Sequence, residues 1–310
     1  MKGHNRKFYS ASLNHCYQNT KNGYLLFYSV FDYLVFFTIF CTTAAKYNVK
    51  VYKLCLMPDH IHISVYAYSR KELYSFIRDY TKLFSKIQNE YYGRSGALFN
   101  SPFGSTPKSD IKKIRTNLIY VDNNPVERSL TEKAEDFRWN FIAFAMSAHP
   151  FSEPIEPGKA SKKLKLSLAL VQERQRANKP LNYQLANMLF KNLDKKESEQ
   201  LTDFIIATFS VIDHSAAIRF FGSYENMLTA DHSTTGSEYE IREIFSGKSD
   251  KVYSHITELL LNSGRFTSIR DVLRLSSDER FELLIQLSGK TAATPEQLAK
   301  YLRLPIIRKK

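Results

Sequence analysis

Residues 56–65 read Leu-Met-Pro-Asp-His-Ile-His-Ile-Ser-Val, so that two histidines flank one isoleucine in an apolar run after a Pro-Asp pair. The apolar and β-branched residues predict a strand. Because residues i and i+2 of a strand share a face, His60 and His62 are expected to point to one side and Ile61 to the other. Two neutral imidazoles on one face can supply two adjacent ligands to a divalent metal. A lone His-x-His pair is more often part of an ordinary half-exposed strand, so a second motif must support this interpretation.

Residues 111–126 provide that second motif, on a predicted helix. Four apolar residues recur at helical spacing and predict a core face: Ile111, Ile114, Leu118 and Val121. Tyr120 is expected roughly opposite that face, with Asn124 beside it one turn later. Pro125 is expected to end the helix, since proline restricts the residue before it. The pattern predicts a tyrosine hydroxyl and an amide oxygen together on a non-core face.

The two motifs together resemble those of the HUH single-tyrosine transposases, and within them the REP-associated tyrosine transposases and their relatives. The matching stretches are residues 57–62, Met-Pro-Asp-His-Ile-His, and residues 120–126, Tyr-Val-Asp-Asn-Asn-Pro-Val. Their order and separation also fit that family. The resemblance covers roughly residues 10–147, and it says little about residues 160–310.

The resemblance implies a metal-dependent DNA endonuclease and strand transferase. Tyr120 would attack the scissile phosphorus, forming a 5′-phosphotyrosine and freeing a 3′-OH. His60 and His62 would hold Mg²⁺ or Mn²⁺, with the Asn124 amide oxygen as third ligand. Asp59 and Asp122 are rival carboxylate ligands. Asp59 ranks lower because it precedes the strand and alternates away from the histidine face.

The expected substrate is single-stranded or hairpin DNA. Four basic residues at the entry of the tyrosine helix are candidates for contacts with phosphates: Lys108, Lys112, Lys113 and Arg115. Any one of them could equally be part of a solvated helix face. Two other functions remain open: a non-catalytic nucleic-acid-binding protein on the same type of sheet, and a zinc hydrolase, for which no third His or Cys ligand lies nearby. A covalent protein–DNA adduct would distinguish the first function from both.

The order of the predicted elements defines an α+β fold for residues 1–150. Strands are expected at residues 13–19, 50–57, 60–66 and 97–107, and helices at 29–47, 70–92 and from Asp110 onward. This order, βαββαβ with an extra helix, is that of the ferredoxin-like split βαβ arrangement. The family named above uses the same core.

Composition favours a polyanionic partner and a reducing compartment. The net charge is +13, and residues 1–150 alone carry 20 Lys and Arg against 11 Asp and Glu. The three cysteines form no Cys-x-x-Cys pair, so neither a disulfide framework nor a structural zinc site is indicated, and a cytoplasmic location suits them. The apolar stretch 24–45 contains Asp32 and predicts a buried helix, not a membrane span.

Residues 151–310 are expected to form a helical C-terminal domain after a proline-rich linker at residues 150–158. Near its end, residues 276–302 predict two helices joined by a short turn, the second starting at Thr294-Pro295. This unit resembles a helix-turn-helix, and a terminal packing hairpin is equally compatible with it. The domain is expected to help grip DNA, and the protein to be a monomer or homodimer.

Overall fold

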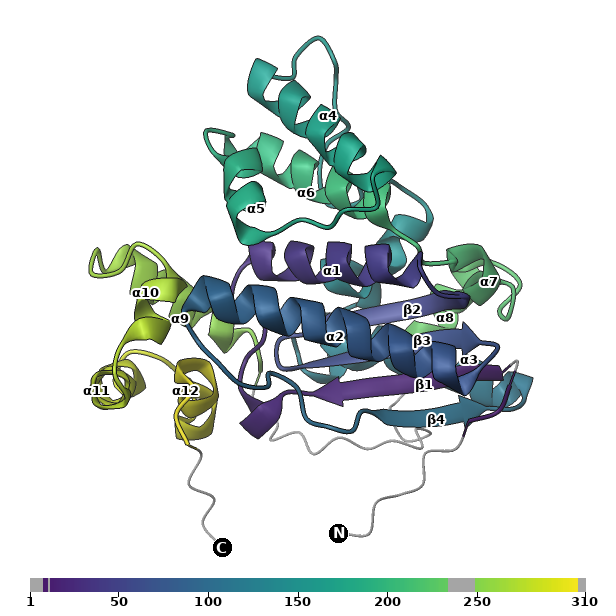
Figure 1. The fold of residues 1–310 in the computed structure, drawn as a ribbon, viewed down its shortest axis with the longest axis horizontal. Helices are drawn as coiled ribbons and strands as arrows, with labels where there is room; N and C mark the ends of the chain where they lie inside the picture. Colours follow the sequence, from purple (N-terminus) through teal and green to yellow (C-terminus); the bar gives the residue numbers. More distant parts are fainter. Residues whose placement is uncertain (1–7, 11, 234–248, 306–310) are drawn as a thin grey trace, which may run out of the picture.

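A four-stranded antiparallel sheet organises the N-terminal half of the protein (Figure 1). The computed structural model describes residues 8–10, 12–233 and 249–305. The strands, in spatial order β2-β3-β1-β4, are Ser12–Asn19 (β1), Val49–Met57 (β2), His60–Ala67 (β3) and Gly104–Lys108 (β4). The helices that alternate with them are Val30–Ala44 (α1), Arg70–Tyr92 (α2) and Ile111–Glu127 (α3). The order β1-α1-β2-β3-α2-β4-α3 confirms the predicted ferredoxin-like βαββαβ core with an extra helix.

The alternation of β3 divides the sheet into an apolar face and a polar face. Ile61 and Ile63 belong to the main hydrophobic core, together with residues of α1 and α2. His60, His62 and Ser64 lie on the opposite face, and this face is the one that contacts α3. Because side chains of a strand alternate between its two faces, the histidines point away from the main core and toward α3, the helix that carries Tyr120.

Helix α1 explains the long apolar stretch of the sequence. It is buried on nearly every side because α2 packs on it within the βαββαβ core and α5 and α6 contact it from the C-terminal half. Figure 1 shows the layer formed by Lys162–Arg176 (α4), Tyr183–Phe190 (α5) and Lys195–Phe209 (α6) above α1. Among the described residues, no helix is long and apolar enough to cross a membrane. The prediction of a buried helix is confirmed.

The remaining helices pack on two parts of the N-terminal half. His214–Ile218 (α7) and Tyr224–Ser233 (α8) contact β2 and α3. Beyond the end toward which β1 runs lie Val252–Asn262 (α9), Ile269–Arg274 (α10), Ser277–Ser288 (α11) and Pro295–Leu302 (α12) (Figure 1). The C-terminal region is helical, as expected. A single cluster of buried apolar side chains extends from α1 and α2 into α5, α6, α9 and α12. The division into two domains at residue 150 stays a prediction.

Three sequence-based details of the elements were wrong. Pro125 was expected to end the helix, but α3 continues to Glu127. Its last turn is closed by a hydrogen bond from the Arg128 N–H to the Asn124 carbonyl. Ile111 is 65 % exposed and not in the core, since α3 is buried only from Asn117 onward. The expected strand at residues 97–107 is confined to Gly104–Lys108, apart from an isolated bridge at Phe99.

Candidate metal and tyrosine site

His60 and His62 lie side by side on the polar face of the sheet. Their ring centroids are 4.9 Å apart and the rings are nearly perpendicular. Both side chains are buried. The structure therefore brings the two predicted ligands together on one rigid strand, as their spacing implies.

Asp59 holds the ring of His60. The Asp59 Oδ1 atom lies 2.6 Å from His60 Nδ1. Burial alone would raise the pKa of Asp59, but the hydrogen bond and charge of His60, together with the Lys300 ammonium, lower it below its ordinary value. The expectation that Asp59 alternates away from the histidines was wrong, because it lies in the turn, where strand alternation does not apply. A carboxylate that fixes one ring nitrogen is the usual support of a metal-binding histidine, since it orients the other nitrogen.

His15 on β1 supports His62 in the same way, and the sequence did not reveal it. His15 Nε2 lies 3.1 Å from His62 Nδ1, and the two rings are stacked with centroids 5.3 Å apart. His60 is hydrogen-bonded to Asp59 through Nδ1, and His62 is hydrogen-bonded to His15 through Nδ1. In both rings Nε2 is therefore the nitrogen that we expect to bind a metal. The only sequence signal for His15 is its place in a strand, and strand order is needed to put it beside His62.

Tyr120 lies over these rings from α3. Its ring meets His62 edge-on at 5.3 Å and His15 edge-on at 5.5 Å between centroids. Tyr120 is only 4 % exposed, so its predicted position on a non-core face was wrong. The reason is that α3 packs this side against the polar face of the sheet. A residue of the candidate site is therefore also a buried residue. Ser64 Oγ donates to Asn117 Oδ1 at 2.8 Å, and this hydrogen bond links α3 to β3.

Asn124 and Asp122 differ in how well they suit a metal. Asn124 Nδ2 donates to the Tyr120 carbonyl at 2.7 Å, which fixes the amide and leaves its oxygen as the ligand-type atom. Asp122 instead forms a buried ion pair with Lys53 at 2.5 Å. Burial raises the pKa of Asp122 despite the lysine beside it. Asp122 is therefore engaged in a structural pair.

The candidate ligands supply a third donor to a divalent ion only if the Asn124 amide oxygen takes part. Across the described ranges, no group of three His, Cys, Asp or Glu side chains is arranged to hold a metal. Two imidazoles and one amide oxygen would be a mixed nitrogen and oxygen set, which suits Mg²⁺ less well than Mn²⁺.

The four basic residues predicted to contact DNA fall into two groups. Lys108 is buried at the end of β4, in register with Leu13 of β1. Lys112, Lys113 and Arg115 are exposed on the first turns of α3. Lys113 pairs with Asp110 at 3.2 Å, and Arg115 lies over the ring of Phe221 at 5.2 Å. The exposed group is accessible to solvent, and its role in DNA binding stays a prediction.

The C-terminal helices reach this site. Lys300 of α12 lies 3.7 Å from Asp59 Oδ2, and its carbonyl accepts from the Leu25 N–H. Helix α12 buries Leu298, Tyr301 and Leu302. Most of its surface is thus used for packing, as in the packing-hairpin alternative to a helix-turn-helix.

Comparison with known proteins agrees with these motifs. Residues 14–124 match the family model described as "Transposase IS200 like". Over this segment the chain is similar to the IS200-like transposases. No curated protein matches the sequence.

One solved structure is similar in part, and it is titled "Structure of the REP associates tyrosine transposase bound to a REP hairpin". The TM-score is 0.41 at 13 % identity, and the similarity covers 52 % of this chain and 98 % of the other.

Proposed function

We propose that the protein is a metal-dependent DNA endonuclease and strand transferase of the single-tyrosine type. One observation carries the proposal: the Tyr120 ring lies edge-on to His62, beside the paired His60 and His62. A hydroxyl-bearing side chain and a two-histidine ligand pair thus share one buried surface. The proposal agrees with the family match over residues 14–124.

His60, His62 and Asn124 would hold Mg²⁺ or Mn²⁺, of which the mixed donor set favours Mn²⁺. Such an ion supplies positive charge to a non-bridging phosphate oxygen when it is bound. Asp59 orients His60, and His15 orients His62, so that both rings are held before the substrate arrives. These supports reduce the reorganisation needed at the moment of reaction.

In the proposed reaction, the Tyr120 hydroxyl oxygen attacks a phosphorus atom of the DNA backbone. A bond from phosphorus to the tyrosine oxygen forms, and the bond from phosphorus to the 3′ oxygen breaks. The phenol loses its proton, and the leaving 3′ oxygen gains one to become a hydroxyl. Because the covalent 5′-phosphotyrosine conserves the bond energy, the 3′-OH of another strand can reverse the step and join two strands.

The substrate is proposed to be single-stranded or hairpin DNA. Lys112, Lys113 and Arg115 are exposed along α3, and the chain as a whole carries a net charge of +13. An extended strand can follow this helix toward Tyr120.

The test is to incubate the protein with pooled hairpin oligonucleotides and Mn²⁺, and to isolate any denaturant-resistant protein–DNA adduct. We expect mass spectrometry to place a nucleotide on the peptide containing Tyr120. Tyr120→Phe should abolish the adduct while changing stability by about 1 kcal/mol or less, since only the hydroxyl is removed. DNA binding should persist in this variant.

Two further variants make the result specific. Tyr91→Phe removes the hydroxyl of a tyrosine on α2 that stacks on Tyr183, and it should form the adduct normally. His60→Ala combined with His62→Ala should lose metal-dependent cleavage. An active Tyr120→Phe protein, or an adduct on Tyr91, would refute the mechanism. DNA binding without any adduct would instead support a non-catalytic nucleic-acid-binding protein.

A further inference from the structure

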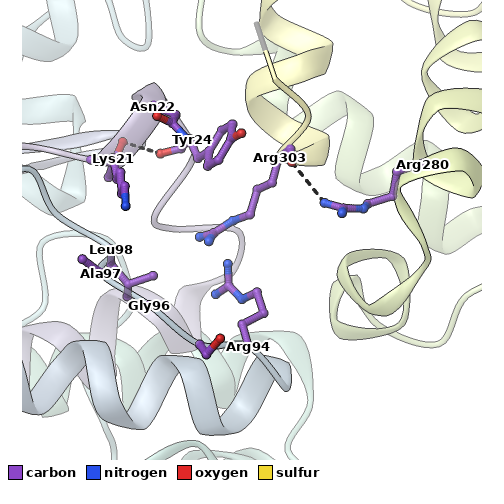
Figure 2. A pocket seen from close by; sticks show the side chains of 11 residues that line it. Lys21, Asn22, Tyr24, Arg94, Gly96, Ala97, Leu98, Arg280 and Arg303 are labelled. Atoms are coloured by element: carbon purple, nitrogen blue, oxygen red, sulfur yellow. Dashed lines mark hydrogen bonds between the residues drawn. The ribbon is translucent and has the colours of Figure 1, made fainter.

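A cavity of about 390 Å³ lies where the C-terminal helices meet the βαββαβ core. Its walls come from the turn after β1, the loop after α2, and the helices α11 and α12 (Figure 2). Its volume lies within the range of pockets that hold small molecules or single nucleotides.

Four cations line this cavity, and none of the described residues in its lining is a carboxylate. They are Lys21, Arg94, Arg280 and Arg303. Figure 2 shows the side chains of Arg94 and Arg303 pointing toward one another across the cavity. Like charges brought together cost free energy unless an anion lies between them. The convergence of cations therefore points to an anionic ligand.

Arg94 gives a second, independent indication. Its Nη2 donates to Gln88 Oε1 at 3.3 Å, and its guanidinium lies over the Tyr92 ring. In the part of the chain that the structure describes, its Nε and Nη1 atoms are buried without a hydrogen-bond partner. A buried charged donor is costly unless it is paired. A phosphate oxygen in the cavity would satisfy these donors with the planar geometry that guanidinium groups favour.

The arginines of the C-terminal helices are held in place by the fold. Arg303 donates through Nη2 to the Leu25 carbonyl at 2.7 Å and through Nε to the Tyr28 hydroxyl at 3.1 Å. Arg280 donates through Nη1 to the carbonyls of Leu302, at 2.8 Å, and Arg303 itself. Two cations are thus fixed before any ligand binds, which lowers the entropy cost of binding.

The cavity lies next to the histidine pair. Asn19, the last residue of β1, pairs with His60 in the sheet. Thr20 follows it, lines the cavity, and donates its N–H to the Asp59 carbonyl at 3.2 Å. A nucleic-acid strand that occupies the site above His60 can therefore continue into the cavity within a short length of backbone.

We propose that this cavity binds a phosphate group of the DNA strand, with Arg94 as the principal contact and the C-terminal helices forming one wall. This proposal rests on the proposed function, because it assumes that a DNA strand is bound at Tyr120. It gives the C-terminal region a direct part in holding the substrate.

The experiment uses the full-length protein and a labelled hairpin oligonucleotide with a single-stranded extension. Affinity is measured over a range of KCl concentrations. We expect Arg94→Gln to weaken binding about tenfold and to reduce the slope of log affinity against log salt by about one. Lys165→Gln removes one charge from the exposed surface of α4, which lies away from α11 and α12 (Figure 1) and contributes no residue to the described lining, and it should leave affinity and slope unchanged. Lys21→Gln changes an exposed residue and should weaken binding in the same direction even if Arg94→Gln unfolds.

Neutral methylphosphonate groups, placed one position at a time along the extension, identify the phosphate. At one position the substitution should weaken binding to the wild-type protein but not to Arg94→Gln. An oligonucleotide with a 5′-terminal phosphate tests whether that group or an internal one is bound, and either result supports the proposal. Inorganic phosphate that raises the unfolding temperature only of the wild type, with no Arg94-dependent position in DNA, would overturn it. So would an unchanged salt slope in folded Arg94→Gln and Lys21→Gln. Adduct formation at Tyr120 is measured separately, so DNA binding without an adduct would contradict only the proposed function.

Discussion

The tautomers of His60 and His62 determine which ring nitrogens the proposed metal could bind. For His62 Nε2 to hold a metal, its Nδ1 must carry the proton and donate to His15 Nε2. His60 Nδ1 likewise donates to the Asp59 carboxylate. The ring of His60 is therefore oriented by Asp59 in the turn before β3, and the ring of His62 by His15 on the neighbouring strand β1. If the two histidines bind a metal as proposed, His15 acts as a positioning residue for His62.

His15→Phe is expected to weaken Mn²⁺ binding by about 10- to 100-fold, since it keeps the ring and removes the nitrogen that fixes His62. His15→Gln offers an amide oxygen in its place and should restore part of the affinity. Calorimetric titration with Mn²⁺ measures both. His255→Gln, which changes an exposed histidine on α9, serves as the control. Wild-type Mn²⁺ affinity in folded His15→Phe would show that His15 has only a packing role.

Among the elements, α1 depends most on one polar residue. Asp32 accepts from the backbone N–H groups of Tyr28 and Ser29 at the start of the helix. It also accepts from the hydroxyls of Tyr92, on α2, at 3.0 Å, and Tyr183, on α5, at 2.6 Å. Burial raises the pKa of Asp32 in spite of these donors. One carboxylate thus caps α1 and joins three helices.

Asp32→Ala should lower the free energy of unfolding by about 2–4 kcal/mol, because it removes the cap and leaves two buried tyrosine hydroxyls without their acceptor. Urea unfolding measures the change. Asp194→Ala is a matched control, since Asp194 caps the exposed start of α6 and accepts from the Glu197 N–H. This control should lose about 1 kcal/mol. Equal losses in the two variants would contradict the joining role of Asp32.

At the scale of the whole molecule, α8 of the C-terminal half packs against α3 and brings a buried carboxylate, that of Asp231, close to charged groups of β2 and α3. Asp231 is buried near the Lys53–Asp122 pair, and neither of its carboxylate oxygens has a hydrogen-bond partner in the described ranges. Burial, together with the charge of Asp122, raises the pKa of Asp231 to about 9. Asn123 Nδ2 donates to the Asp231 carbonyl at 2.8 Å and holds this segment against α3.

The raised pKa predicts how stability depends on pH. The folded protein retains a proton on Asp231 that the unfolded chain releases above about pH 4, so the free energy of unfolding should fall as pH rises from about 4 toward 9. The slope for one proton is at most about 1.4 kcal/mol per pH unit. Asp231→Asn stays neutral and should remove this contribution. Urea unfolding at about pH 5 and about pH 8 should show the variant gaining stability relative to the wild type at the higher pH. A difference that does not vary with pH would contradict this assignment.

Local sequence determined where most of the helices and strands lie and on which of them the candidate site residues stand. Ser69 caps α2 through the Glu72 N–H, and Thr294 caps α12 through the Gln297 N–H, as their spacing predicts. The period of two places His60 and His62 on one face. These features depend on contacts within a few residues, and such contacts are fixed by the chain itself.

Tertiary structure alone decided what surrounds those residues. Strand order puts His15 beside His62, and the packing of α3 turns Tyr120 inward, where helical periodicity suggested the opposite face. The docking of α12 brings Lys300 to Asp59 and closes the cavity near Arg94. These contacts join residues far apart in the chain. Which strands pair and which helix side is covered depend on the burial of the whole molecule, so no local pattern of residues can specify them.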